Sequence, residues 1–220
     1  MTREELLQTA KPVFLNENAI RAILDGRKSI FRKFIDIDIS NQFDIETNGK
    51  TVIAYINQET GDSYNPTEIC MFQPGNILYV RETWNISNMY TDGDKNGVVF
   101  IYKSDKSEEE SAVTIFVNDE SYYKYEEMMC NSSEWRSPVQ MPKEAARIFL
   151  KVTNVRVERL RDIKYMDCLH EGVKYKQIER DVIYAFSKVW NSTIKKSDIN
   201  RYGWDANPWV WVIEFERLEK

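Results

Sequence analysis

Four cationic side chains fall within seven residues of the sequence, in the segment GRKSIFRK. Arg27, Lys28, Arg32 and Lys33 flank the strand-like pair Ile30–Phe31. Lys28 and Arg32 are four residues apart, so they share one face if the segment is a strand. Such a pair of cations suits a phosphate or a carboxylate. The segment therefore predicts an anion or nucleotide site; the alternative is a solvated edge strand whose cations extend into water.

Three further candidates follow from the segment ILYVRETW, residues 77–84. Arg81 and Glu82 are adjacent on an expected strand and point to opposite faces, so at most one of them faces a ligand. An inward Arg81 could bind an anion or a base edge, or form an ion pair across the sheet. Trp84 could stack on a base, as aromatic side chains do in proteins that bind single strands, or pack in the core.

A metal or a cofactor is not expected. Cys70, Cys130 and Cys168 are scattered along the chain, and the single histidine, His170, has no cysteine at ligand spacing. We interpret the cysteines as reduced core residues and His170 as a helix-surface residue.

Hydrophobic patterning gives the elements that position these residues. NENAIRAILDG indicates a short helix that Asn16 or Asn18 can cap and that Gly26 ends. Strands are expected at about 29–36 and 77–84. The cations at 27–33 therefore lie at a helix-to-strand junction.

The C-terminal third alternates between strand and helix patterns. RIFLKVTNVRVERL, residues 147–160, predicts a long strand whose alternation slips near Thr153–Asn154, as at a bulge or bend. Helices are expected at about 165–172 and 174–191, and WVIEFERL predicts a closing strand. The second helix has an apolar stripe formed by Ile178, Val182, Phe186 and Val189.

We expect one domain that spans residues 1–220, with residues 86–134 as an insertion. The insertion contains strand-like VVFIY and AVTIFV around the acidic run SDKSEEES, which predicts an extra acidic hairpin or subdomain. Residues 105–127 hold eight acids against two lysines, so the insertion could bind a protein partner. The fold class is α+β: either a small mixed barrel with flanking helices or an open α+β sandwich.

Composition narrows the class of protein. The chain has 220 residues, 42% hydrophobic and 13% aromatic, which indicates a globular protein. The net charge of −5 argues against general coating of nucleic acid, although 14 Lys/Arg against eight Asp/Glu in residues 143–201 allow a local cationic site. No stretch has the length of a membrane span and the N-terminus is unlike a signal peptide, so a cytoplasmic location is expected.

Several spaced segments together resemble the ASCH domains, which have a PUA-like barrel fold. GRKSIFRK is similar to the start of these domains, QPGNILYVRETW to a following strand, MDCLHEG to a short helix, and WVIEFERL to the closing strand. WRSPVQMPKEAARIFLKVTNVRVERLRDI resembles a mostly prophage-encoded branch of the family. The resemblance covers residues 12–218 apart from the insertion, and it implies binding of RNA or a modified nucleotide.

The resemblance also implies candidate catalytic residues. One group of ASCH domains hydrolyses N4-acylated cytidine with a lysine, a threonine and a glutamate, which fall here on Lys28, Phe31 and Glu171. Phe31 has no hydroxyl, so an amidohydrolase would need Ser29 as a shifted nucleophile. Glu171 lies directly before Gly172, at the end of the short helix expected near residues 165–172. In the role that the resemblance implies, Glu171 would form an ion pair with Lys28 and fix the lysine in a ligand pocket. The alternative is a solvent-exposed carboxylate at a helix terminus.

The leading hypothesis is therefore a module that binds RNA or a modified nucleotide or nucleoside in a cationic cleft at the mouth of the barrel. Its ligand site would comprise Lys28, Ser29, Arg32, Arg81, Glu82, Trp84 and Glu171. The alternatives are an amidohydrolase that uses Lys28, Ser29 and Glu171, and a non-catalytic phage accessory protein whose acidic insertion binds a partner.

Overall fold

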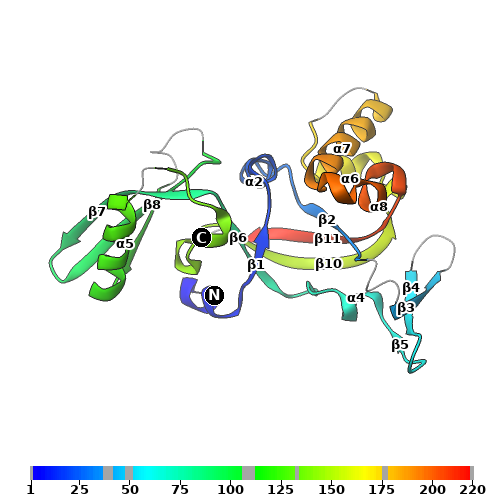
Figure 1. The fold of residues 1–220 in the computed structure, drawn as a ribbon, viewed down its shortest axis with the longest axis horizontal. Helices are drawn as coiled ribbons and strands as arrows, with labels where there is room; N and C mark the ends of the chain where they lie inside the picture. Colours follow the sequence, from blue (N-terminus) through cyan, green and yellow to red (C-terminus); the bar gives the residue numbers. More distant parts are fainter. Residues whose placement is uncertain are drawn as a thin grey trace. The chain divides into compact units, whose positions relative to one another are not determined.

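A computed structural model gives the architecture of the chain and describes residues 2–36, 42–47, 52–105, 112–131, 134–174 and 178–218 (Figure 1). The chain divides into two compact units. The first unit comprises residues 1–24, 77–150 and 218–220, and the second comprises residues 25–76 and 151–217. The chain therefore passes between the units several times.

The first unit contains the N-terminal elements and the insertion. Its elements are α1 (Arg3–Thr9), β1 (Lys11–Phe14), α2 (Glu17–Leu24), β6 (Ile77–Arg81), β7 (Trp84–Asp92), β8 (Lys95–Tyr102), β9 (Val113–Val117), α5 (Asp119–Asn131) and the 3₁₀ turns η1 (Pro138–Gln140) and η2 (Lys143–Ala145).

Local sequence signals explain the start of this unit. The side chain of Asn16 accepts a hydrogen bond from the Ala19 amide, as expected for a residue that caps α2. Gly26, with φ of 71°, follows the end of α2 in the left-handed conformation that glycine tolerates. β1 and β6 then pair in parallel, with Val13 opposite Val80.

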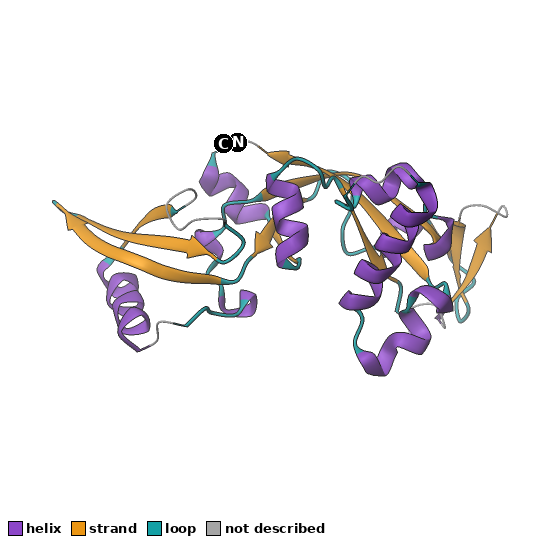
Figure 2. Ribbon diagram, turned by 90° about the horizontal axis from the view of Figure 1, so that it is seen from above, coloured by secondary structure: helices purple, strands orange, loops and turns teal. Residues whose placement is uncertain are grey.

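The segment predicted as an insertion contains a sheet of its own. β7, β8 and β9 form an antiparallel three-stranded sheet, and α5 lies along β7 and β8 (Figures 1 and 2). The hairpin was predicted, whereas α5 was not, because its apolar residues are sparse. The acidic residues 106–111 lie outside the described residues.

Buried side chains from the insertion and from the N-terminal elements form one core in the first unit. Trp84, Phe100 and Tyr125 pack with Leu6 and Met141 in this cluster. The insertion is therefore part of the core of this unit.

The second unit contains the remaining strands and the C-terminal helices. Its elements are β2 (Ile30–Phe34), β3 (Phe43–Thr47), β4 (Val52–Asn57), β5 (Ser63–Tyr64), α4 (Pro66–Ile69), β10 (Phe149–Arg159, within this unit from residue 151), η3 (Leu160–Asp162), α6 (Tyr165–His170), α7 (Glu179–Thr193), η4 (Lys196–Asp198), α8 (Ile199–Tyr202), η5 (Trp204–Ala206) and β11 (Trp209–Leu218).

Three strands form the framework of the second unit. β10, β11 and β2 are neighbours in this order, and helices α6, α7 and α8 lie on one side of them (Figure 1). β11 pairs antiparallel with β2, with Val212 opposite Arg32 and Ile213 opposite Phe31. β3, β4 and β5 form a separate antiparallel sheet.

The predicted slip in β10 is confirmed. Val152 and Val155 are buried, and Thr153 and Asn154 between them are both exposed. Val157 continues the buried set from Val155 at the new parity. One extra exposed residue therefore shifts the inward positions of the second half of the strand.

The predicted apolar stripe of α7 is half correct. Val182 and Phe186 are buried, whereas Ile178 and Val189 are exposed, and Trp190 takes the inward position instead. Residues 178 and 182 are one turn apart, but Ile178 precedes the helix as its N-cap, so its side chain does not follow the helical face.

The α+β class is confirmed, but the described strands form open sheets and no closed barrel. Within the part of the chain that the structure describes, no helix has the length and apolar character needed to cross a membrane.

Candidate functional site

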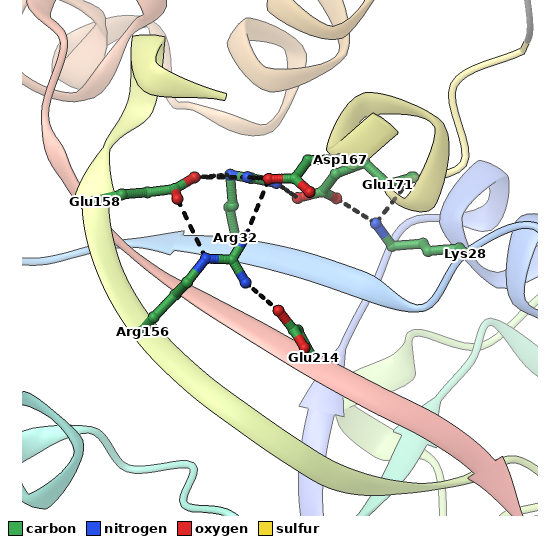
Figure 3. A network of polar contacts seen from close by, with 7 residues as sticks. All are labelled: Lys28, Arg32, Arg156, Glu158, Asp167, Glu171 and Glu214. Carbon is green, nitrogen blue, oxygen red and sulfur yellow. Dashed lines mark hydrogen bonds and ion pairs between the residues drawn. The ribbon is translucent and has the colours of Figure 1, made fainter. Parts of the chain in front are cut away.

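Seven charged side chains of the second unit form a continuous set of ion pairs, which we call the charged network (Figure 3). They come from the start of β2, from β10, from α6 and its C-terminal end, and from β11. Three cations and four carboxylates give the network a formal charge of −1. Its members are Lys28, Arg32, Arg156, Glu158, Asp167, Glu171 and Glu214.

The expected ion pair between Lys28 and Glu171 is present. Lys28 Nζ lies 2.5 Å from Glu171 Oε2 and also donates to the Glu171 carbonyl at 2.9 Å. The neighbouring backbone supports this contact, because the Ser29 amide donates to the His170 carbonyl at 2.8 Å. Both side chains are buried, so the solvated alternative for Glu171 is wrong.

Arg32 lies at the centre of the charged network. Its guanidinium donates to Glu158, Asp167 and Glu171 at distances of 2.6 to 3.3 Å, and its side chain is fully buried. Burial opposes the charge, yet Glu171 and Glu158 outweigh that effect and raise the pKa of Arg32. Arg32 therefore remains charged, and its donors already have carboxylate partners.

Arg156 holds the outer carboxylates of the network. Its three nitrogens each donate to a different acid: Nε to Glu158 at 3.3 Å, Nη2 to Asp167 at 3.0 Å, and Nη1 to Glu214. Side-chain exposure rises from 0% at Arg32 to 29% at Arg156 and 34% at Glu214. The network thus has a buried end and an end open to solvent.

The face of β2 that carries Phe31 is separate from the network. The Phe31 ring packs against Phe72 and Phe215, with centroids 5.8 and 5.9 Å away. Ile30, one position earlier, belongs to the core beneath α6 and α7. Ser29 has the parity of Phe31, whereas Lys28 and Arg32 have that of Ile30. Phe31, which stands where the resemblance would place a catalytic threonine, is therefore a core aromatic residue.

Arg81 and Trp84, two of the three predicted ligand residues in the segment 77–84, belong to the first unit and have structural contacts there. Arg81 Nη2 donates to the Met141 carbonyl at 2.9 Å, and its guanidinium lies over the Phe14 ring. Trp84 is fully buried and packs against Phe100 at 5.5 Å. These contacts agree with the packing alternative for Trp84.

Glu82 forms a second buried ion cluster in the first unit. Its carboxylate accepts from Arg147 at 2.8 and 2.9 Å and from Ser104 at 2.7 Å. Arg147 also donates to Asp105 and lies over the Tyr102 ring. Glu82 is fully buried, and these partners compensate its charge.

Sequence reasoning missed four members of the charged network: Arg156, Glu158, Asp167 and Glu214. One signal was present, since Asp167 and Glu171 are four residues apart and thus share a helical face. Arg156 and Glu158 likewise share a strand face after the slip in β10. Neither signal identifies Arg32 as the common partner, because the strands converge only in the folded chain.

No group of histidine, cysteine or acidic side chains among the described residues is arranged to hold a metal ion. Comparisons with protein-family models, with curated proteins and with solved structures found no match.

Proposed function

We propose that the chain is a binding module for RNA or for a modified nucleotide or nucleoside, and that the charged network reads the base. The observation that carries this proposal is the buried pair of Lys28 and Glu171, 143 residues apart in sequence. The ASCH resemblance places at these positions two of the three catalytic residues of the group that hydrolyses N4-acylated cytidine. A buried set of hydrogen-bonded acids and bases at this place supports a functional role, because it holds polar groups in fixed directions for a ligand.

The charge balance favours recognition of a base over recognition of a phosphate. Lys28 and Arg32 are the cations that suggest phosphate binding, and carboxylates neutralise both. Ionised carboxylates only accept hydrogen bonds, so they suit the N–H groups of a base. A base turned out of its stack would present such an edge to the solvent-accessible end of the network.

The proposed activity is binding without hydrolysis. Phe31 replaces the hydroxyl that the resemblance requires, and its ring is enclosed by Phe72 and Phe215. We expect no release of acetate when the protein is incubated with N4-acetylcytidine and followed by chromatography. Turnover that is lost in Ser29→Ala would instead establish the amidohydrolase alternative.

Binding of single-stranded RNA and of nucleosides to the Asp167→Asn variant tests the proposal. Asp167 accepts from Arg32 and Arg156 and is partly exposed, so a ligand can reach it. We expect the affinity to fall about tenfold, as for loss of one charge-assisted hydrogen bond. Titration calorimetry measures this change.

Glu216→Gln is the matched control, because Glu216 forms an exposed ion pair with Lys151 outside the network. It should bind as the wild type does. Absence of binding by the wild type, or equal binding by wild type and Asp167→Asn, would contradict the proposed site.

A further inference from the structure

We infer that Arg156 is an internal competitor for the base, and that the base is guanine. This inference rests on the proposed function and specifies its ligand. It follows from the contacts that the partly exposed Arg156 guanidinium makes with the acids around it (Figure 3).

The contacts of Arg156 define which ligand groups this end of the network can bind. Three acids from three elements, Glu158 on β10, Asp167 on α6 and Glu214 on β11, each accept from a different nitrogen of one planar group. The acceptors therefore surround a flat group with several adjacent N–H donors. A ligand that replaces Arg156 must offer similar donors, or it leaves carboxylates without partners.

Burial determines which part of the network can exchange its partner. Arg32 is fully buried and holds Glu158 and Asp167 from the inner side. Arg156 and Glu214 are the most exposed members of the network. Arg156 can thus swing into solvent while Arg32 keeps Glu158 and Asp167 in place.

Among the unmodified bases, guanine matches this acceptor set. Its N1–H and its N2 amino group are adjacent donors on one edge, which resembles one side of a guanidinium. Adenine and cytosine place a ring nitrogen acceptor beside their amino group, and that lone pair would face a carboxylate. Uracil has one N–H between two carbonyl groups. A site that hydrogen-bonds its ligand through buried or half-buried polar groups discriminates strongly against an analogue without the donor.

Competition by Arg156 has a measurable consequence. In the wild type, a base gains contacts with carboxylates only when those carboxylates release Arg156. Removing the guanidinium takes one donor each from Glu158, Asp167 and Glu214 and leaves the network more negative by one charge. A donor-rich base should then bind more tightly.

Calorimetric titration with neutral nucleosides tests the inference without interference from a phosphate. We expect wild-type protein to bind guanosine about tenfold more tightly than inosine, which lacks only the N2 amino group. Arg156→Gln should tighten guanosine binding about tenfold, and Arg156→Lys, which keeps the charge but has fewer donor directions, should have a smaller effect. Lys151→Gln removes a cation from the same strand outside the network and should leave the affinity unchanged.

The outcomes separate this inference from the proposed function. Equal affinity for guanosine and inosine, or weaker guanosine binding in a folded Arg156→Gln variant, would overturn the inference while base binding stands. If Arg156→Gln does not fold, the inference is tested by guanosine binding to Arg156→Lys and by the wild-type affinities for guanosine and inosine. Absence of binding to every nucleoside and to RNA would remove the proposed function and this inference together.

Discussion

Burial decides what the cations at the start of β2 can bind. Lys28 and Arg32 are both buried and bound to acids, so neither is an open phosphate ligand. A buried cation requires a compensating charge, and Glu171 supplies it to both side chains. Glu171 is therefore the residue on which the inner end of the charged network depends most directly.

Replacing Glu171 by glutamine should destabilise the second unit. The substitution leaves Lys28 and Arg32 without one buried counter-charge, so we expect the free energy of unfolding to fall by about 3 kcal/mol. Urea denaturation measures the change. Glu216→Gln, which removes the acid of an exposed pair, should cost less than about 0.5 kcal/mol. Equal losses in the two variants would show that the buried ion pair contributes no more to the free energy of unfolding than the exposed one.

The cysteines should differ sharply in reactivity. Burial raises the pKa of the Cys168 thiol to about 12, whereas Cys130 is exposed on α5. At pH 8 only roughly one Cys168 in ten thousand is a thiolate, the reactive form. We expect Cys130 to react rapidly with Ellman's reagent and Cys168 to react only after unfolding. A rapid phase that persists in Cys130→Ser would contradict this assignment.

At the level of elements, β10 and α7 place the network. The slip at Thr153–Asn154 changes which residues of β10 face inward, and Arg156 and Glu158 follow that change. α7 supports the other side, because the Phe186 ring lies 5.7 Å from the Arg32 guanidinium and packs near Trp190 and Trp204.

Two substitutions in α7 distinguish its buried face from its exposed face. Phe186→Ala removes a buried ring and a cation–π contact, so we expect a loss of about 3–5 kcal/mol in the free energy of unfolding. Val189→Ala, on the exposed face, should change it by less than about 0.5 kcal/mol. Thermal and urea denaturation of both variants measure the difference. A large loss in Val189→Ala would contradict the assigned face.

At the level of the whole molecule, both units contain buried acids that resist ionisation. Burial raises the pKa of Tyr102 and of Tyr125 in the first unit and of Tyr55 and Cys168 in the second. Glu144, which accepts a hydrogen bond from the Tyr125 hydroxyl, adds to the shift of Tyr125. Each group is therefore neutral in the folded chain at a pH at which the unfolded chain has begun to ionise.

The protein should lose stability in alkali. A pKa that is higher in the folded than in the unfolded state contributes stability that is complete below the unfolded pKa and declines as the pH rises towards the folded value. The decline should begin near pH 8.5 with Cys168 and steepen above about pH 10 with the tyrosines. The free energy of unfolding in urea, measured from pH 8 to pH 11, checks this profile.

Tyr125→Phe should reduce the slope above pH 10, because it removes one of the buried phenols. Tyr184→Phe is the matched control, since Tyr184 is exposed on α7, and it should leave the slope unchanged. Identical slopes in both variants would rule out a contribution from Tyr125.

The sequence by itself determined the local structure of this protein. The end of α2 at Gly26, the strands from 30 to 34 and from 77 to 81, the slip in β10 and the closing strand follow from alternation and from turn residues, which act over a few neighbours. The pairing of Lys28 with Glu171 was expected only through the resemblance to the ASCH domains. α5 was missed because its sequence has a weak apolar pattern.

The tertiary structure alone decided how the charges are arranged. Glu158 and Asp167 meet Arg32 across 126 and 135 residues of sequence, and Arg156 meets Glu214 across 58. Contacts at such separations depend on strand order and on helix packing, which no local pattern encodes. Burial is likewise a property of the assembled core, so only the folded chain shows that acids neutralise Lys28 and Arg32 and that Phe31 lies on the other face of β2.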